Sequence, residues 1–106
     1  MLVYNPSGWA PSSNNVVDYS AETLPFTKTA PAAGWFFMRK IAGISSAYIG
    51  LQMSSSPYMR AIVHSKTSAD HLGVFLPVKK GQKVEFQGDA SGAYEGVGFA
   101  YSEYSV

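Results

Sequence analysis

The clearest structural signal lies in residues 47–64, AYIGLQMSSSPYMRAIVH, where apolar and polar side chains alternate in two runs. A period of two residues is typical of a β-strand with one buried face. If Met53 pairs with Met59, residues 54–58 form the connecting loop and both apolar sets share one face. The stretch therefore predicts an antiparallel hairpin whose register follows from its hydrophobic pattern.

The opposite face of this hairpin is polar and aromatic. It presents Tyr48, Gln52, Arg60 and His64, and the neighbouring loops add Tyr58, Asp70 and His71. An aromatic ring covers the C–H groups of a sugar, while Arg and Gln bond to hydroxyls or a carboxylate. We therefore predict a ligand-binding surface that consists of Tyr48, Gln52, Tyr58, Arg60, His64 and His71. The alternative is that this face packs on a neighbouring subunit or is simply solvated.

Shorter patterns on both sides of the hairpin predict further strands. They cover residues 16–20, 24–29, 35–42, 72–78, 83–87 and 97–102. Pro25 favours an edge position for the second of them, and Gly81 suits a left-handed conformation in the turn over residues 79–82. About eight short strands separated by turn residues predict an all-β fold, an antiparallel β-sandwich of the jelly-roll type.

The chain is expected to form one domain, because 106 residues leave room for a single core. Residues 1–15 are rich in Asn, Ser and Pro and are predicted to be an irregular lead-in or loop. Trp9, within that segment, caps the core or joins a partner in this interpretation. Residues 16–106 then form the jelly-roll domain.

Composition excludes several classes of protein. Hydrophobic residues at 46% and charged residues at 14% exclude disordered and coiled-coil proteins, which are rich in charge. The absence of Cys excludes disulfides and thiolate metal sites. A net charge of +1 creates no field that would favour nucleic acid. No apolar run reaches transmembrane length and the N-terminus lacks signal-peptide regions, so we expect neither membrane insertion nor conventional secretion.

Charges are unevenly distributed along the chain. Residues 1–27 and residues 84–106 contain acids but no Lys or Arg. Residues 28–83 contain all eight Lys and Arg, with Asp70 as the single acid. We expect charge pairing between neighbouring strands. The alternative is a basic surface for an anionic glycan.

No catalytic signature is present in the sequence. Phosphate-binding glycine motifs are absent, and residues 43–47, GISSA, lack the last glycine of a nucleophile elbow. The carboxylates available for glycoside hydrolysis are Asp89, Glu95 and Glu103, but so short a chain hardly builds the deep cleft that substrate distortion needs. The metal-type cluster of His64, Asp70 and His71 lacks a convincing fourth ligand. We therefore expect neither an enzyme nor a bound metal or cofactor.

Two segments leave apolar surface that a single sandwich does not cover. Residues 35–38, WFFM, are apolar on both faces, and the last strand has a nearly bare face of Gly98, Ala100 and Ser102. Such surface is typical of an interface between copies of a chain. We expect the subunit contacts to come from Trp35, Phe37, Tyr101 and Tyr104.

Three motifs occur in order along the chain. Residues 30–36, APAAGWF, follow the pattern APxxG-aromatic; residues 75–84, FLPVKKGQKV, follow PVxKGDxV; and residues 99–103, FAYSE, follow FxYxE. Together they resemble the C-terminal head domains of phage tail fibres over roughly residues 24–106. Those heads are similar to tumour-necrosis-factor-like jelly rolls, which generally assemble as trimers at the end of a shaft. Gln82 stands where the pattern has Asp, and we expect this change to keep the turn but to remove one side-chain cap that Asp could provide.

The resemblance implies a homotrimeric head on a virion, at the tip of a tail fibre or spike, and it carries over no binding residues. Our leading hypothesis is a non-catalytic receptor-binding head that recognises a saccharide or a protein on the host surface. One alternative is a structural trimerisation or capping module without a ligand. A second alternative is a free-standing bacterial sugar-binding module.

Overall fold

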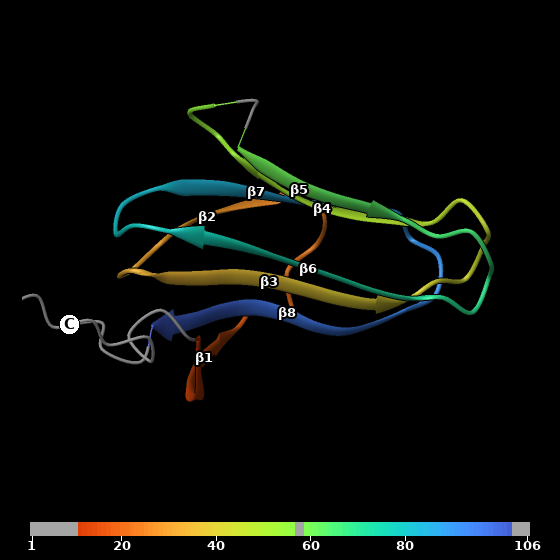
Figure 1. Ribbon diagram of the computed structural model, residues 1–106, viewed down its shortest axis with the longest axis horizontal. Helices are drawn as coiled ribbons and strands as arrows, with labels where there is room; N and C mark the ends of the chain where they lie inside the picture. Colours follow the sequence, from red (N-terminus) through yellow and green to blue (C-terminus); the bar gives the residue numbers. More distant parts are fainter. Residues whose placement is uncertain (1–10, 57–58, 103–106) are drawn as a thin grey trace, which may run out of the picture.

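The computed structural model describes residues 11–56 and 59–102 of the chain (Figure 1). These ranges form β1 (Pro11–Asp18), β2 (Phe26–Thr29), β3 (Gly34–Ile41), β4 (Tyr48–Met53), β5 (Arg60–His64), β6 (His71–Val78), β7 (Lys83–Gly88) and β8 (Ala93–Ser102). They contain no helix, and therefore none long and apolar enough to cross a membrane. The prediction of an all-β fold is confirmed.

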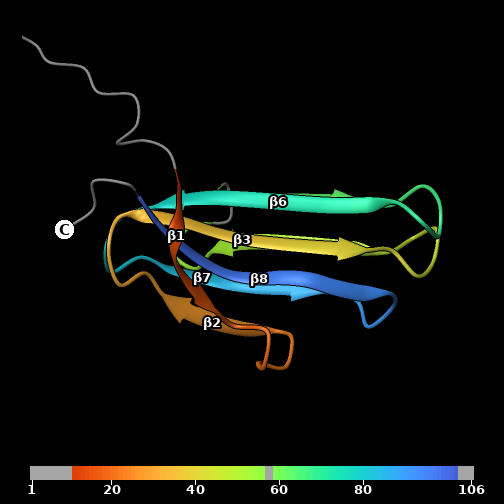
Figure 2. The same cartoon turned by 90° about the horizontal axis from the view of Figure 1, so that it is seen from below.

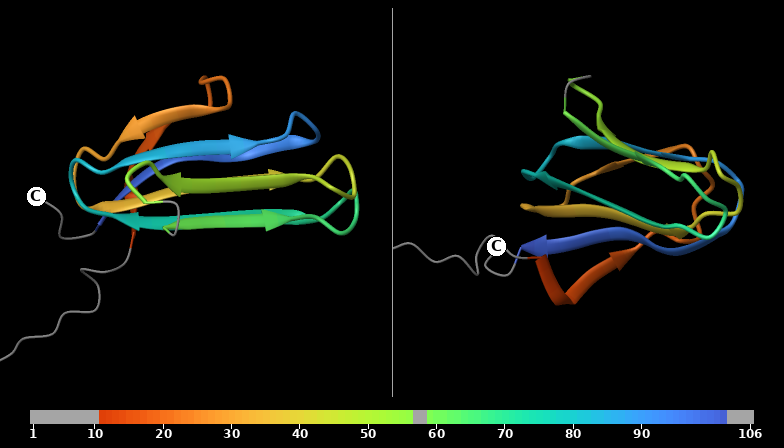
Figure 3. Two further views of the ribbon diagram at one scale, coloured as in Figure 1. Left: turned by 90° about the horizontal axis from the view of Figure 1, so that it is seen from above. Right: turned by 45° about the vertical axis from the view of Figure 1, so that its right-hand side comes forward.

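The strands form two four-stranded antiparallel sheets that pack face to face (Figure 2). Sheet A has the order β1-β8-β3-β6, and sheet B has the order β2-β7-β4-β5. Successive strands alternate between the sheets, except that β4 and β5 are neighbours in sheet B. This connectivity is that of a jelly roll, so the predicted sandwich is confirmed. Figure 3 shows the two layers from two further directions.

The predicted hairpin register is also confirmed. Ile49 lies opposite Val63 and Leu51 lies opposite Ala61. The Met53 backbone N–H donates to the Met59 carbonyl oxygen over 2.8 Å, as the pairing of these two residues requires. Ile49 and Leu51 are buried against sheet A. This burial fixes the register, because a shift of one residue would expose the whole apolar set to solvent.

Aromatic rings from both sheets fill the centre of the core. Phe36 and Phe99 come from sheet A and Phe86 comes from sheet B, and all three are fully buried. The ring centroid of Phe36 lies 5.3 Å from that of Phe86 and 5.1 Å from that of Phe99. Phe26 stacks on Phe86 at 4.5 Å. Burial of each ring contributes about 1.5–3 kcal/mol to the stability of the fold, so this cluster is a main part of the packing between the two sheets.

The N-terminal boundary of the domain differs from the prediction. Residues 11–15 belong to β1, whereas the sequence predicts an irregular lead-in up to residue 15. β1 is an edge strand in which Pro11 pairs with Ser102 and Val16 with Ala100, with a register shift between the two pairs. An irregular edge strand tolerates Pro and Asn, since few of its N–H groups need a partner. Trp9 lies outside the described residues.

Candidate functional site

The outer side of sheet B brings together four of the predicted ligand-binding residues. Tyr48 lies opposite His64, and their ring centroids are 5.8 Å apart. Gln52 lies opposite Arg60 in the same hairpin. All four side chains point away from the core because their sequence neighbours Ile49, Leu51, Ala61 and Val63 point into it.

The next strand, β7, adds two polar residues to this surface. Gln52 lies between Arg60 and Glu85, and Gly50 lies between Ile62 and Gln87. The Gln87 Nε2 group donates a hydrogen bond to Glu85 Oε1. We define the sheet B face as Tyr48, Gln52, Arg60, Ile62, His64, Glu85 and Gln87. The alternation of Val84 and Phe86 indicates that Glu85 and Gln87 point outward. The sequence does not show that β7 pairs with β4, so it does not place these two residues beside Gln52.

One residue predicted for this surface lies elsewhere, and another falls outside the described residues. His71 is the first residue of β6 and lies on the outer side of sheet A, where its Nδ1 atom is 3.7 Å from Glu95 Oε1. The structure therefore separates His71 from the other predicted residues, because the polar segment before β6 crosses from sheet B to sheet A. Tyr58 lies outside the described residues.

Asp70 has a structural role in the turn before β6. Its carboxylate accepts hydrogen bonds from the backbone N–H groups of Lys66 and Thr67, at 2.7 and 3.0 Å, and from Thr67 Oγ1 at 2.6 Å. The hydrogen bonds from Thr67 and then Lys66 lower the pKa of Asp70 to about 2. Within residues 11–56 and 59–102, no group of three His, Asp or Glu side chains is arranged to hold a metal ion.

Part of the outer side of sheet A, near the start of β3 and the end of β6, is apolar. Trp35 and Phe37 come from β3, and Phe75 and Pro77 come from the adjacent edge strand β6. The Phe37 and Phe75 rings lie 6.3 Å apart, and Phe75 is 52% exposed. We define the sheet A face as Val16, Trp35, Phe37, Phe75 and Pro77.

Small residues of β8 leave space for the rings of the sheet A face. Gly98 lies opposite Phe37, and Ala100 lies opposite Trp35. A Cβ atom on Gly98 would lie 2.2 Å from the Val17 carbonyl oxygen and 3.0 Å from the Phe37 ring. The bare face predicted for the last strand is therefore covered by a ring of the same chain and approached by the backbone of β1.

Tyr101 is not on the sheet A face, so the structure does not place it with Trp35 and Phe37. Its ring centroid lies 5.0 Å from that of Phe99, and the side chain packs against the core. Phe99 and Tyr101 are two positions apart in the strand, so both side chains point to the same, inner side of β8. Tyr104 lies outside the described residues, and Trp35 and Phe37 do lie on the apolar face.

The predicted charge pairing between neighbouring strands is confirmed at one place, and a second ion pair joins a strand to a turn. Arg39 of β3 lies 3.7 Å from Glu95 of β8 on the outer side of sheet A. Lys40, the next residue, points inward, and its Nζ atom lies 2.6 Å from Asp89 Oδ1. Both pairs join a base of residues 28–83 to an acid of residues 84–106.

The Lys40–Asp89 pair forms a network that the sequence analysis missed. Lys40 is fully buried, and its Nζ atom also donates to the Asp89 carbonyl oxygen at 2.9 Å and lies 4.7 Å from the Tyr94 ring centroid. Asp89 Oδ1 accepts a hydrogen bond from the Tyr48 backbone N–H at 2.9 Å. The network therefore links β3, the β7–β8 turn and the start of β4, where the sheet B face begins.

The electrostatics of this network follow from its hydrogen bonds. Burial alone would raise the pKa of Asp89, but the hydrogen bonds from Lys40, Ser91 and the Tyr48 N–H hold that pKa well below its usual range. Burial raises the pKa of Tyr94 to about 12, and the Asp89 carboxylate adds to the effect. The Tyr94 hydroxyl is therefore protonated near neutral pH, and it donates to the Asp89 carbonyl oxygen at 2.8 Å.

Comparison of the chain with protein-family models, with curated proteins and with solved structures gave no match.

Proposed function

We propose that this protein is a non-catalytic recognition domain that assembles as a homotrimer and binds a host-surface saccharide. The observation that supports this function is the chemical difference between the two outer faces of the sandwich. The sheet A face is apolar and suits contact with further copies, whereas the sheet B face presents rings beside planar hydrogen-bonding groups. The resemblance to phage tail-fibre heads supports three-fold assembly and a position at the tip of a virion fibre.

The exposed rings of the sheet A face support assembly. Phe75 and Val16 are 52% and 47% exposed. Large apolar side chains in a contiguous exposed patch are typical of protein interfaces. The Phe37 ring lies beside Phe75 and extends this apolar surface from β6 toward β8. We therefore assign the sheet A face to the contact between copies.

A charge placed on the sheet A face is expected to dissociate the assembly. Phe75→Glu should give the mass of a monomer in light scattering at micromolar concentration, because the carboxylate would be buried without a partner. Ile62→Glu is the matched control, since Ile62 is 40% exposed on the sheet B face and should leave the trimer intact. A monomeric wild-type protein, or dissociation by Ile62→Glu alone, would contradict the assignment.

The sheet B face supports saccharide binding through its combination of side chains. Tyr48 and His64 present adjacent rings that can lie against the C–H groups of a sugar. Gln52, Glu85 and Arg60 follow in one row across three strands and offer donors and acceptors for hydroxyl groups. Arg60 forms no ion pair with any other described residue, so its guanidinium is available for a ligand.

Removal of the ring or the guanidinium is expected to weaken saccharide binding. Tyr48→Ala and Arg60→Ala should each cost about 1–2 kcal/mol of binding free energy, as contact residues of these types do. The affinity is measured for glycans selected on an array, with variants confirmed to be folded and trimeric. Thr29→Ala, an exposed position on the edge strand β2, is the control and should not change the affinity.

The outcome of these measurements separates the candidate functions. Unchanged glycan binding in both variants would exclude the sheet B face as the site. A trimer that binds no glycan on the array would support a structural trimerisation module, or a head whose receptor is a protein. A protein that binds glycan as a monomer would support a free-standing sugar-binding module.

A further inference from the structure

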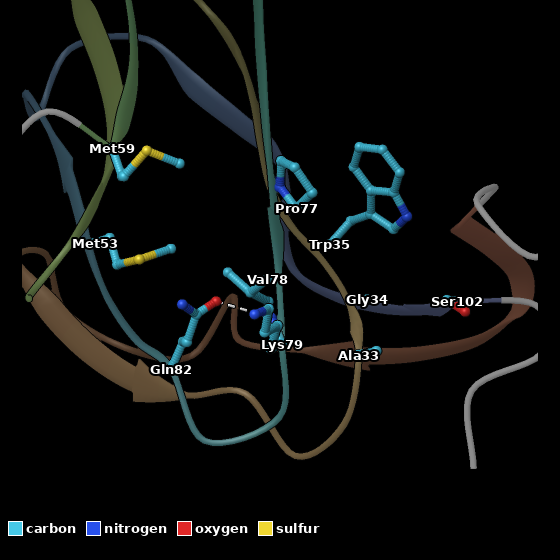
Figure 4. A pocket seen from close by; sticks show the side chains of 10 residues that line it. All are labelled: Ala33, Gly34, Trp35, Met53, Met59, Pro77, Val78, Lys79, Gln82 and Ser102. Carbon is cyan, nitrogen blue, oxygen red and sulfur yellow. Dashed lines mark hydrogen bonds between the residues drawn. The ribbon is translucent and has the colours of Figure 1, made fainter. Parts of the chain in front are cut away.

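A cleft opens at the end of the sandwich opposite the Lys40–Asp89 network (Figure 4). Its volume is about 580 Å³, within the range of roughly 300–1,000 Å³ that is typical of small-molecule sites. Met53 from the end of β4 and Met59 line one side, and Pro77 and Val78 from the end of β6 line the other. The cleft is separate from the sheet B face and adjoins the sheet A face, with which it shares Trp35 and Pro77.

The floor and walls of the cleft suit a flexible apolar group. Met53 is 5% exposed and closes the floor, whereas Met59 is 48% exposed and stands at the lip. Thioether side chains adapt their shape to an apolar ligand more readily than branched side chains do. Pro77 offers no backbone N–H, so the edge strand β6 presents no hydrogen-bond donor at that point of the wall.

The rim of the cleft is polar and carries one lysine, Lys79. Gln82 Oε1 accepts a hydrogen bond from the Lys79 backbone N–H at 2.8 Å, and Figure 4 shows the Gln82 amide nitrogen on the side toward Met53. Lys79 lines the cleft, and Lys80 and Lys83 lie in or next to the same turn. Within the described part of the chain these lysines form no ion pair, and no acid lines the cleft.

From this arrangement we propose that the cleft binds an anionic amphiphile. The alkyl body lies between Met53, Met59 and Pro77, and its carboxylate or phosphate head lies at the Lys79–Lys80 turn. An apolar floor beside the Lys79 ammonium, with Lys80 next to it in the turn, is complementary to such a molecule and to neither a neutral sugar nor a cation. This proposal does not depend on the saccharide function proposed for the sheet B face.

Decanoate is the probe that tests the proposal. In the Trp9→Phe variant Trp35 is the single tryptophan, so its fluorescence reports on the wall of the cleft. We expect a saturable change with decanoate, and at least tenfold weaker binding of decyltrimethylammonium, which has the same body and the opposite charge. Decyl phosphate should bind like decanoate, whereas inorganic phosphate alone should not, because it lacks the apolar body. Calorimetry on the wild-type protein provides the same affinities without the Trp9 substitution.

Substitutions then assign the body and the head to their parts of the cleft. Met59→Gln, at an exposed position, should weaken decanoate at least tenfold, and the double variant Lys79→Gln, Lys80→Gln should weaken it at least fivefold. Lys66→Gln, an exposed lysine before β6, is the charge control and should have no effect.

Three results would overturn the proposal. They are absence of saturable binding, equal affinity for the two charged probes, and equal affinity of Met59→Gln and the wild-type protein. Light scattering is recorded at the same concentrations in parallel. A fluorescence change that follows self-association without decanoate would assign the cleft to a second copy of the chain, and would also overturn the proposal.

Discussion

Replacement of Asp89 with alanine is expected to lower the free energy of unfolding by about 3 kcal/mol, which is typical of a buried ion pair that loses one partner. The Lys40 ammonium is fully buried, and without Asp89 it would keep only the backbone carbonyl oxygen at 2.9 Å and the Tyr94 ring. Urea denaturation at pH 7 and a fixed protein concentration measures the loss, since assembly makes stability depend on concentration.

Two further variants show whether the uncompensated charge is the cause. Asp18→Ala removes an exposed carboxylate that bonds only locally, to Ser20, and should cost less than about 1 kcal/mol. Combining Lys40→Met with Asp89→Ala removes both charges and should recover more than half of the loss, because an apolar side chain replaces the buried ammonium. An Asp89→Ala protein as stable as Asp18→Ala would show that the pair adds little to the fold.

The contribution of Asp89 should also depend on pH. Its pKa in the folded protein is depressed below the unfolded value of about 3.9, so its stabilising effect is complete above about pH 5 and is lost as the pH falls toward the folded value. The stability difference between wild type and Asp89→Ala should therefore be constant from about pH 5 to 8 and shrink near pH 2–3. The depressed pKa of Asp70 affects both proteins alike and cancels in this difference.

The sequence predicts those features that depend on neighbouring residues. The hairpin register follows from alternation alone, because only the pairing of Met53 with Met59 places Ile49 and Leu51 on the same side as Ala61 and Val63. The outward position of Tyr48, Gln52, Arg60 and His64 follows from the same alternation. The jelly-roll class follows from the spacing of several such short runs.

The sequence does not predict which sheet each strand joins. His71 was assigned to the hairpin surface because it follows the polar segment after His64, but β6 pairs with β3 in sheet A. Alternation shows which side chains of a strand point into the core, but it does not show which other strand pairs with it. For Tyr101, alternation alone indicates an inward side chain, since Tyr101 lies on the same side of the strand as Phe99. Its aromatic character suggests a subunit contact, but its position in the strand does not.

Long-range pairs are the second feature that the sequence leaves open. Lys40 shares the alternation of Phe36 and Met38, which indicates an inward side chain, yet a buried lysine needs a partner. That partner, Asp89, is 49 residues away, so no local pattern connects the two. The cleft between Met53, Met59 and Pro77 is likewise formed only because β4 and β6 end, and β5 begins, at the same end of the sandwich.

Two glycines with positive φ angles should respond very differently to alanine. Gly81 has φ +89° and Gly92 has φ +70°, so both adopt a left-handed conformation that costs a residue with a Cβ atom about 1–2 kcal/mol. A Cβ atom on Gly81 would meet nothing within 4 Å, so Gly81→Ala should cost about 1 kcal/mol. A Cβ atom on Gly92 would lie 1.9 Å from the Ile41 carbonyl oxygen and 2.7 Å from the Gly43 nitrogen.

The Gly92→Ala loss should therefore reach about 3 kcal/mol, because overpacking adds to the backbone strain. Both neighbours of the new methyl group are backbone atoms, which cannot rotate away as a side chain would. The β7–β8 turn would have to separate from the end of β3, and Asp89 would move away from Lys40 and from the Tyr48 N–H. Urea denaturation of the two variants under identical conditions tests this: equal losses for Gly81→Ala and Gly92→Ala would show that the φ angle alone, and not the close contact with β3, selects glycine at residue 92.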